Sequence, residues 1–262
     1  MNPFYIVYSA VSYALFLAWF LYAIGFVGDM FVPKSINAPE GAGGWTALVI
    51  DVTVLAAFSF QHSLMARPAF KRWWTRVVPS AIERSTYVLF SSLFFGMIFV
   101  AWQPLPTPVW DLRGTPAAPV LLAFYVLGWL IVLLASFMIN HFELFGLAQV
   151  WRKVRERPAP DSVFTEKFLY RFVRHPIMLG LLIAFWAAPE MTQGRLLFAL
   201  LTSAYIVIGV RLEERDLIKN LGAKYLNYRA RVPMLLPLPL PLPLPKSEHG
   251  HEAVRDKPDT AH

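Results

Sequence analysis

The sequence predicts an all-α fold, a polytopic membrane helix bundle of about five to six transmembrane segments. Hydrophobic residues make up 56% of the 262 residues and charged residues only 16%, whereas soluble domains carry about 25% charged residues. Because so few polar side chains cannot cover a water-soluble globule, a soluble enzyme is excluded. The sequence contains no cysteine, which also excludes disulfide scaffolds, zinc–thiolate sites and cysteine nucleophiles.

Four apolar segments are long enough, or nearly so, to cross a bilayer, which takes about 20 apolar residues. They cover residues 4–28, 45–66, 86–102 and 119–139. The first lacks the basic start and the cleavage site of a signal peptide. We therefore expect it to remain in the mature protein as a membrane span.

Two shorter apolar runs follow within residues 176–210, joined by a turn-like sequence at 189–194. We predict a helical hairpin here, which either spans the membrane or enters it only partly. A cytoplasmic connector over residues 140–175 precedes the hairpin, and a cytoplasmic helix over residues 211–236 follows it. In the tail, residues 237–262, a Pro-Leu alternation favours polyproline II, and the polar remainder predicts disorder.

The distribution of positive charge predicts how the chain is oriented. Of the 24 Lys and Arg residues, 21 fall on one side of the predicted spans, and only Lys34, Arg113 and Arg195 fall on the other. The positive-inside rule places the richer side in the cytoplasm, so both termini should be cytoplasmic. The net charge of +7 then suits a lipid bilayer surface, and we expect no nucleic-acid partner.

Arg174, His175 and Pro176 begin the predicted hairpin at its cytoplasmic mouth. Proline is favourable at the first helical position, and an arginine can bind a carboxylate through two parallel hydrogen bonds. Gly180, one turn further on, would let another backbone or a ligand approach closely. The block therefore predicts either a well-formed helix start or part of a binding site.

Glu213 and Glu214 lie where the second half of the hairpin leaves the membrane. The hairpin should return them to the depth of Arg174 and His175, so that an arginine, a histidine and two carboxylates converge. S-adenosylmethionine would suit such a site, because arginine matches its carboxylate and glutamate matches its amino group or ribose hydroxyls. Nearby aromatic side chains would suit its adenine and its sulfonium.

Four further ionisable residues lie within or directly after apolar helices, where such residues are costly and are often functional. Asp51 and His62 lie within the second predicted span, and His141 with Glu143 follows the fourth span directly. Each could instead be a structural hydrogen-bonding residue. We expect His141, His62 and Glu143 to be the candidates for chemistry, with the carboxylate of Glu143 keeping His141 basic. Three histidines outside the tail are too few for a di-iron site, so no metal is expected.

The Arg-His-Pro block with Gly180 and the Glu-Glu pair resembles the signature of integral-membrane methyltransferases. That superfamily includes isoprenylcysteine carboxyl methyltransferases and phospholipid methyltransferases. Residues 222–229 are similar to its C-terminal cytoplasmic segment. Met178 departs from the family pattern, which often has tyrosine there. Blocks at residues 61–67, 140–147 and 184–187 resemble the bacterial methanethiol S-methyltransferases more narrowly.

This resemblance covers residues 45–235 and implies S-adenosylmethionine-dependent methylation of methanethiol to dimethyl sulfide in the bacterial inner membrane. It implies transmembrane helices in residues 1–112, a methyltransferase core in 113–236 and a separate tail. His141, His62 and Glu143 would then act on the thiol. The implied cofactor-binding residues are Arg174, His175, Pro176, Gly180, Glu213, Glu214, Tyr225, Tyr228 and Arg229.

Other functions stay open on the sequence. The acceptor could be another small thiol, a lipid amine or a prenylcysteine carboxylate. A membrane reductase that uses a nicotinamide cofactor has a similar C-terminal layout, and a denitrification-associated membrane protein without enzymatic activity shares part of the histidine-bearing blocks. A transporter has little support, because few polar residues would line its path.

Overall fold

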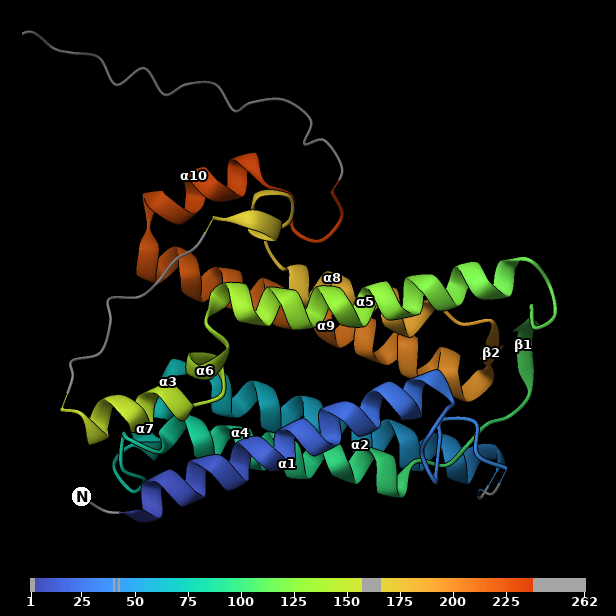
Figure 1. The fold of residues 1–262 in the computed structure, drawn as a ribbon, viewed down its shortest axis with the longest axis horizontal. Helices are drawn as coiled ribbons and strands as arrows, with labels where there is room; N and C mark the ends of the chain where they lie inside the picture. The colour runs from blue at the N-terminus through green and yellow to red at the C-terminus, as the bar shows by residue number, and fades with distance from the viewer. Residues whose placement is uncertain (1–2, 40, 42, 157–165, 238–262) are drawn as a thin grey trace, which may run out of the picture.

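A computed structural model describes residues 3–39, 41, 43–156 and 166–237 (Figure 1). The predicted tail beyond residue 237 and part of the predicted connector lie outside the described residues. The elements, in chain order, are α1 (Pro3–Gly28), α2 (Gly44–Ala66), α3 (Pro68–Trp74), α4 (Glu83–Ala101), β1 (Pro108–Asp111), α5 (Ala117–Ile139), α6 (His141–Leu144), α7 (Leu147–Val154), the 3-10 helix η1 (Phe168–Arg171), α8 (Pro176–Trp186), β2 (Glu190–Thr192), α9 (Gln193–Leu221) and α10 (Ala223–Arg231).

The structure confirms the all-α membrane bundle. Five described helices are long and apolar enough to cross a membrane, namely α1, α2, α4, α5 and α9. The shorter α8 has 11 residues and therefore a length of about 16 Å, roughly half the hydrocarbon thickness of a bilayer. The first half of the predicted hairpin is thus a half-span that packs against the full-length α5.

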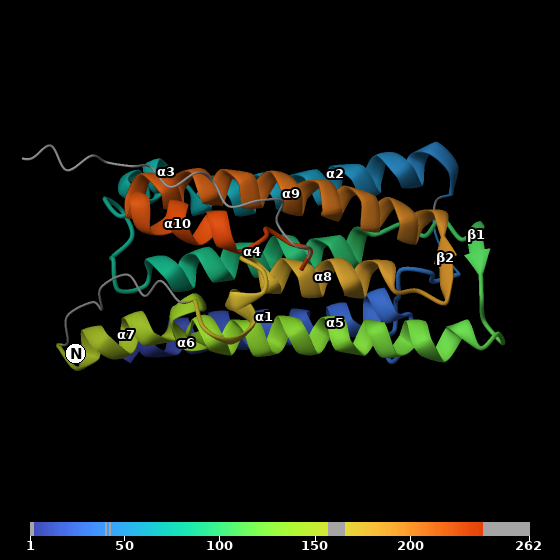
Figure 2. The ribbon, with the colours of Figure 1, turned by 90° about the horizontal axis from the view of Figure 1, so that it is seen from above.

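The long helices run alternately up and down in two layers. In Figures 1 and 2, one layer holds α1, α4 and α2, and the other holds α5, α8 and α9, with α9 lying over α2. The start of α1 and all of α10 lie at one end of the bundle, which we call the α10 end. The antiparallel pair β1–β2 lies at the opposite end.

The C-terminal region differs from the predicted boundaries. The predicted hairpin ends at residue 210, but α9 continues to Leu221, because good helix formers such as Leu, Glu, Arg and Lys follow the apolar run. Gly222, with φ of 54°, ends the helix, and a left-handed conformation of this kind favours glycine. The predicted helix over 211–236 is therefore the end of α9 followed by the short α10, which folds back against it.

Close packing of α5 on α8 holds the half-span in place. A Cβ atom added to Gly180 would lie 2.6 Å from the carbonyl oxygen of Gly128 and 2.9 Å from the backbone nitrogen of Val132. Small residues allow such close approach between membrane helices. Gly180 thus serves contact between two backbones, which was one of the two roles expected for it, and this geometry gives no support to a cofactor contact.

Candidate functional site

Arg174 and Glu214 form a buried ion pair at the α10 end of the bundle. The Nε atom of Arg174 donates to Oε1 of Glu214 at 2.7 Å, and both side chains are buried. Nη1 of Arg174 also donates to the backbone carbonyl oxygens of Arg229 and Val232. These bonds tie three segments together, the loop before α8, the end of α9 and the end of α10.

Backbone hydrogen bonds hold the same segments in register. The N–H groups of Arg174 and His175 donate to the carbonyl oxygens of Pro233 and Met234 at 2.9 and 3.2 Å. Pro176 then occupies the first turn of α8, as the sequence predicts. The chain after α10 therefore returns to the start of α8 and holds the backbone of Arg174 and His175 in place.

His175 lies between the two glutamates. Its Nε2 is 3.2 Å from Oε1 of Glu214, and its Nδ1 is 3.6 Å from Oε2 of Glu213. The side chain of Glu213 is 53% exposed, whereas that of Glu214 is 6% exposed. Arg229, at 49% exposure, approaches Glu214 at 3.6 Å. The predicted convergence is present, with Glu214 at its centre and Glu213 and Arg229 at its rim.

Two tyrosines of α10, Tyr225 and Tyr228, lie close to this cluster. The hydroxyl group of Tyr228 donates to the carbonyl oxygen of Tyr170 at 2.7 Å. Burial raises the pKa of Tyr228 to about 12, and burial followed by the charge of Glu214 raises the pKa of Tyr225. Both side chains are buried, so they stay neutral at physiological pH and hold α10 against the charged cluster.

His141 lies at the sharp break between α5 and α6. Its Nε2 is 2.8 Å from the hydroxyl oxygen of Tyr13, and its Nδ1 is 2.9 Å from that of Ser136. The ring of Phe137 stacks on the imidazole, with 4.4 Å between the ring centroids. Burial lowers the pKa of His141, so the imidazole is neutral at physiological pH and bonds to two hydroxyl groups.

Glu143 takes a different partner from the one that the sequence suggests. Its carboxylate forms an ion pair through two hydrogen bonds with the guanidinium of Arg152 in α7. The carboxylate that was expected to stabilise a positive charge on His141 therefore binds Arg152 instead. This happens because α7 folds back over α6 and brings a stronger cation to the carboxylate. This ion pair braces α6 against α7.

His62 lies where α2, α4 and α9 meet. Its Nε2 is 2.8 Å from the hydroxyl oxygen of Tyr87, and its Nδ1 is 3.1 Å from that of Ser91. Its ring meets the edge of Tyr205, a residue of α9, at 6.4 Å between centroids. Sequence reasoning missed Tyr87 and Tyr205, although a tyrosine in an apolar helix needs a partner for its hydroxyl group.

Asp51 has a structural contact at the opposite end of the bundle. Its Oδ1 accepts a hydrogen bond from the backbone N–H of Gln103 at 2.7 Å, just after α4. The side chain is fully buried. This bond joins α2 to the segment after α4, far along the bundle from the charged cluster.

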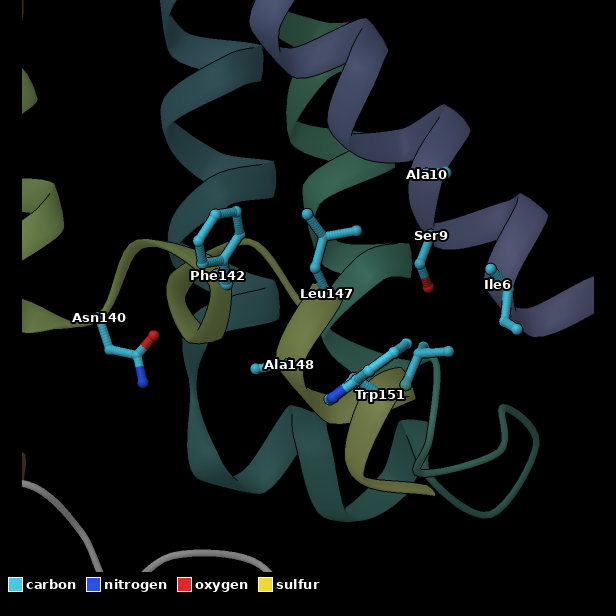
Figure 3. Close-up of a pocket in the computed structure, with 9 residues that line it drawn as sticks. Ile6, Ser9, Ala10, Asn140, Phe142, Leu147, Ala148 and Trp151 are labelled. Atoms are coloured by element: carbon cyan, nitrogen blue, oxygen red, sulfur yellow. The ribbon is translucent and has the colours of Figure 1, made fainter. Parts of the chain in front are cut away.

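A hollow of about 430 Å³ lies between α1 and α7 (Figure 3). Its walls are mainly apolar and come from Ile6, Ser9, Ala10, Asn140, Phe142, Leu147, Ala148, Val150 and Trp151. None of these nine residues is among those predicted to bind a cofactor. The hollow is thus separate from the Arg174–Glu214 cluster.

The fold and the cluster define an integral-membrane helical bundle with a polar, charged cluster at its α10 end. No family profile matches the chain, and no solved structure matches it. Curated proteins, by contrast, do match the chain. Methanethiol S-methyltransferase 2 of Bradyrhizobium diazoefficiens is 50% identical over 232 residues, which are 88% of this chain and 89% of that protein.

Methanethiol S-methyltransferase of Mycobacterium tuberculosis is also 50% identical over 232 residues, covering 88% of this chain and 95% of that protein. Nurim of Rattus norvegicus is 32% identical over 204 residues, covering 71% and 77% of the two chains. The chain therefore belongs to the methanethiol S-methyltransferase family, and nurim is a more distant relative. The family consists of methyltransferases, whose reaction requires a methyl donor.

Proposed function

We propose that this protein transfers a methyl group from S-adenosylmethionine to methanethiol, releasing dimethyl sulfide, S-adenosylhomocysteine and a proton. The relatives that are 44–50% identical carry the name of this activity. The convergence of Arg174, His175, Glu213 and Glu214 is the observation that supports a site for the donor. When bound, the donor supplies a methyl group on a positively charged sulfur.

The charges of the cluster fit such a donor. Glu213 and Arg229 are half-exposed, so a carboxylate is available for the amino group, the ribose hydroxyls or the sulfonium, and a guanidinium for the carboxylate. Arg174 donates to Glu214 and to two backbone carbonyls. We therefore assign Glu213 and Arg229 to ligand contact, and Arg174 and Glu214 to positioning.

Three residues were predicted to act on the thiol, and their contacts differ. His62 adjoins Tyr205 of α9, the helix that carries Glu213. His141 and Glu143 contact α1, α5 and α7. We propose His62 as the group that accepts the hydrogen bond and then the proton of the thiol, with His141 and Glu143 as the alternatives that mutation must test.

The activity is tested in membranes that contain the full chain. With methyl-labelled S-adenosylmethionine and methanethiol, we expect volatile labelled dimethyl sulfide, and little when the thiol is omitted. Arg229→Ala should weaken the affinity for the donor by about 1–3 kcal/mol, the value of a charge-assisted hydrogen bond. Label recovered in the lipid fraction, with none in dimethyl sulfide, would contradict the proposal and favour a lipid acceptor.

We also propose that the α10 end faces the cytoplasm of a bacterial inner membrane. The 21 Lys and Arg residues assigned to one side support this, as do the positions of the start of α1 and of α10 at the same end (Figure 1). Reporter fusions at His262 and within residues 103–117 should report opposite sides. Reports from the same side would contradict the topology.

A further inference from the structure

One side of α9 faces α2 over more than two helical turns. Tyr205, Gly209 and Glu213 are spaced four residues apart, so they lie on one side of the helix. Helix α2 contacts the first of these residues, since the hydroxyl group of Ser63 in α2 donates a hydrogen bond to that of Tyr205 at 3.3 Å. The contact fixes one end of this stretch.

A second contact fixes the other end, and the space between the two is open. Arg67 of α2 pairs with Asp216 of α9 at 3.2 Å. Between the contacts, a Cβ atom added to Gly209 would meet no side chain or other element within 4 Å. Glu213 is 53% exposed there, although the adjacent Glu214 is buried. We call this space the Gly209 gap.

A glycine that faces lipid would also have open space around it, but Gly209 lies on the side of α9 that meets α2. The exposed residues Ala204 and Ile208 lie on another side of the helix. Glycine in a helix interior lowers helix stability relative to alanine. A glycine between two inter-helix contacts, with nothing packed against it, therefore points to a requirement for space.

Polar groups lie near Tyr205, at one end of this stretch of α9. His62 meets Tyr205 edge to face and bonds to the hydroxyl groups of Tyr87 and Ser91. The ring of Phe58 stacks on the imidazole of His62, with 5.3 Å between the ring centroids. The surroundings thus combine hydroxyl groups with apolar ring surface, which suits a small ligand that has one weakly polar atom.

Two charged residues, Arg84 and Glu213, lie in this part of the bundle. The guanidinium of Arg84 lies 4.9 Å from the ring centroid of Tyr87, the residue whose hydroxyl group bonds to His62. Glu213 lies one helical turn beyond Gly209 in α9. The positive charge of Arg84 favours an anion such as a thiolate, and Glu213 links the gap to His175 at the charged cluster.

We propose that the Gly209 gap binds the methyl acceptor, a small alkyl thiol, with His62 and Tyr205 in contact with its sulfur. The missing side chain at position 209 limits the size of the thiol that fits. This inference rests on the proposed function, because it assumes that a thiol is methylated. It adds the place where the thiol binds and the residue that selects for its size.

The test compares Gly209→Ala, Gly209→Leu and the control Ala204→Leu, which adds the same side chain on an exposed side of α9. Steady-state kinetics with methanethiol, ethanethiol and propanethiol are combined with donor binding by the full-length protein in detergent. Gly209→Leu should raise KM for methanethiol by about tenfold or more, the effect of one or more misplaced methylenes. Gly209→Ala should raise KM more for propanethiol than for methanethiol, and affinity for the donor should stay unchanged.

Gly209→Ala guards against loss of folding, because alanine favours the helix. Unchanged KM values in both Gly209 variants would overturn the inference while leaving the proposed function intact. An equal rise in KM for Ala204→Leu would overturn it too, since the effect would then come from the helix as a whole. A wild-type protein that binds the donor but forms no dimethyl sulfide would instead contradict the proposed function.

Discussion

Replacing His62 by alanine is expected to lower turnover by about 10²–10⁴-fold, the usual contribution of a positioned general base. His62 is bonded to Tyr87 and Ser91 and adjoins Tyr205 of α9, so it is placed to receive a proton from a thiol beside that helix. The loss should shrink at high pH, where the thiol ionises without help. Turnover per folded molecule, measured across pH at saturating donor, checks this.

His141→Ala is the matched control. His141 bonds to Tyr13 and Ser136 on the opposite side of the bundle from α9, and its loss leaves two hydroxyl groups without this partner. We expect a lower free energy of unfolding, by about 1–3 kcal/mol, with nearly unchanged turnover per folded molecule. A larger, pH-dependent loss for His141→Ala than for His62→Ala would restore His141 as the proton acceptor. A pH-independent loss for His62→Ala would make His62 a positioning residue.

Replacing Glu214 by glutamine is expected to lower the free energy of unfolding by about 3–5 kcal/mol. The buried carboxylate accepts a hydrogen bond from Nε of Arg174 at 2.7 Å. Its Oε1 also lies 3.2 Å from Nε2 of His175. Removing one partner of a buried ion pair leaves the other charge uncompensated, which is more costly than the pair itself is stabilising. Thermal and denaturant unfolding in detergent measure the change.

Glu213→Gln makes the same chemical change at the neighbouring position. Because this side chain is 53% exposed, folding should be nearly unaffected, while affinity for S-adenosylmethionine should fall by about 1–3 kcal/mol. If both variants weaken donor binding equally and neither lowers stability, Glu214 contacts the ligand directly. If neither variant changes donor affinity, the cluster is structural and the donor binds elsewhere.

The sequence by itself determined the first four membrane spans, because their apolar character is a local property of about 20 consecutive residues. The charge asymmetry and the polar residues at one set of helix ends are also visible in the sequence. They predicted that Arg174, His175 and Glu214 lie close together, as they do in the structure. A helical hairpin was enough for this prediction, because the second helix of a hairpin ends at the membrane depth where the first helix begins.

Only the tertiary structure decided which partner each polar residue takes. Glu143 pairs with Arg152 because α7 folds back over α6, and Gly180 meets Gly128 because α8 packs on α5. Glu213 and Glu214 are adjacent in the chain, yet one lies at the rim and the other in the interior. The gap at Gly209 likewise arises from contacts between α2 and α9 across more than 140 residues of sequence. Such contacts depend on how helices from distant parts of the chain pack, and local residue patterns do not encode that packing directly.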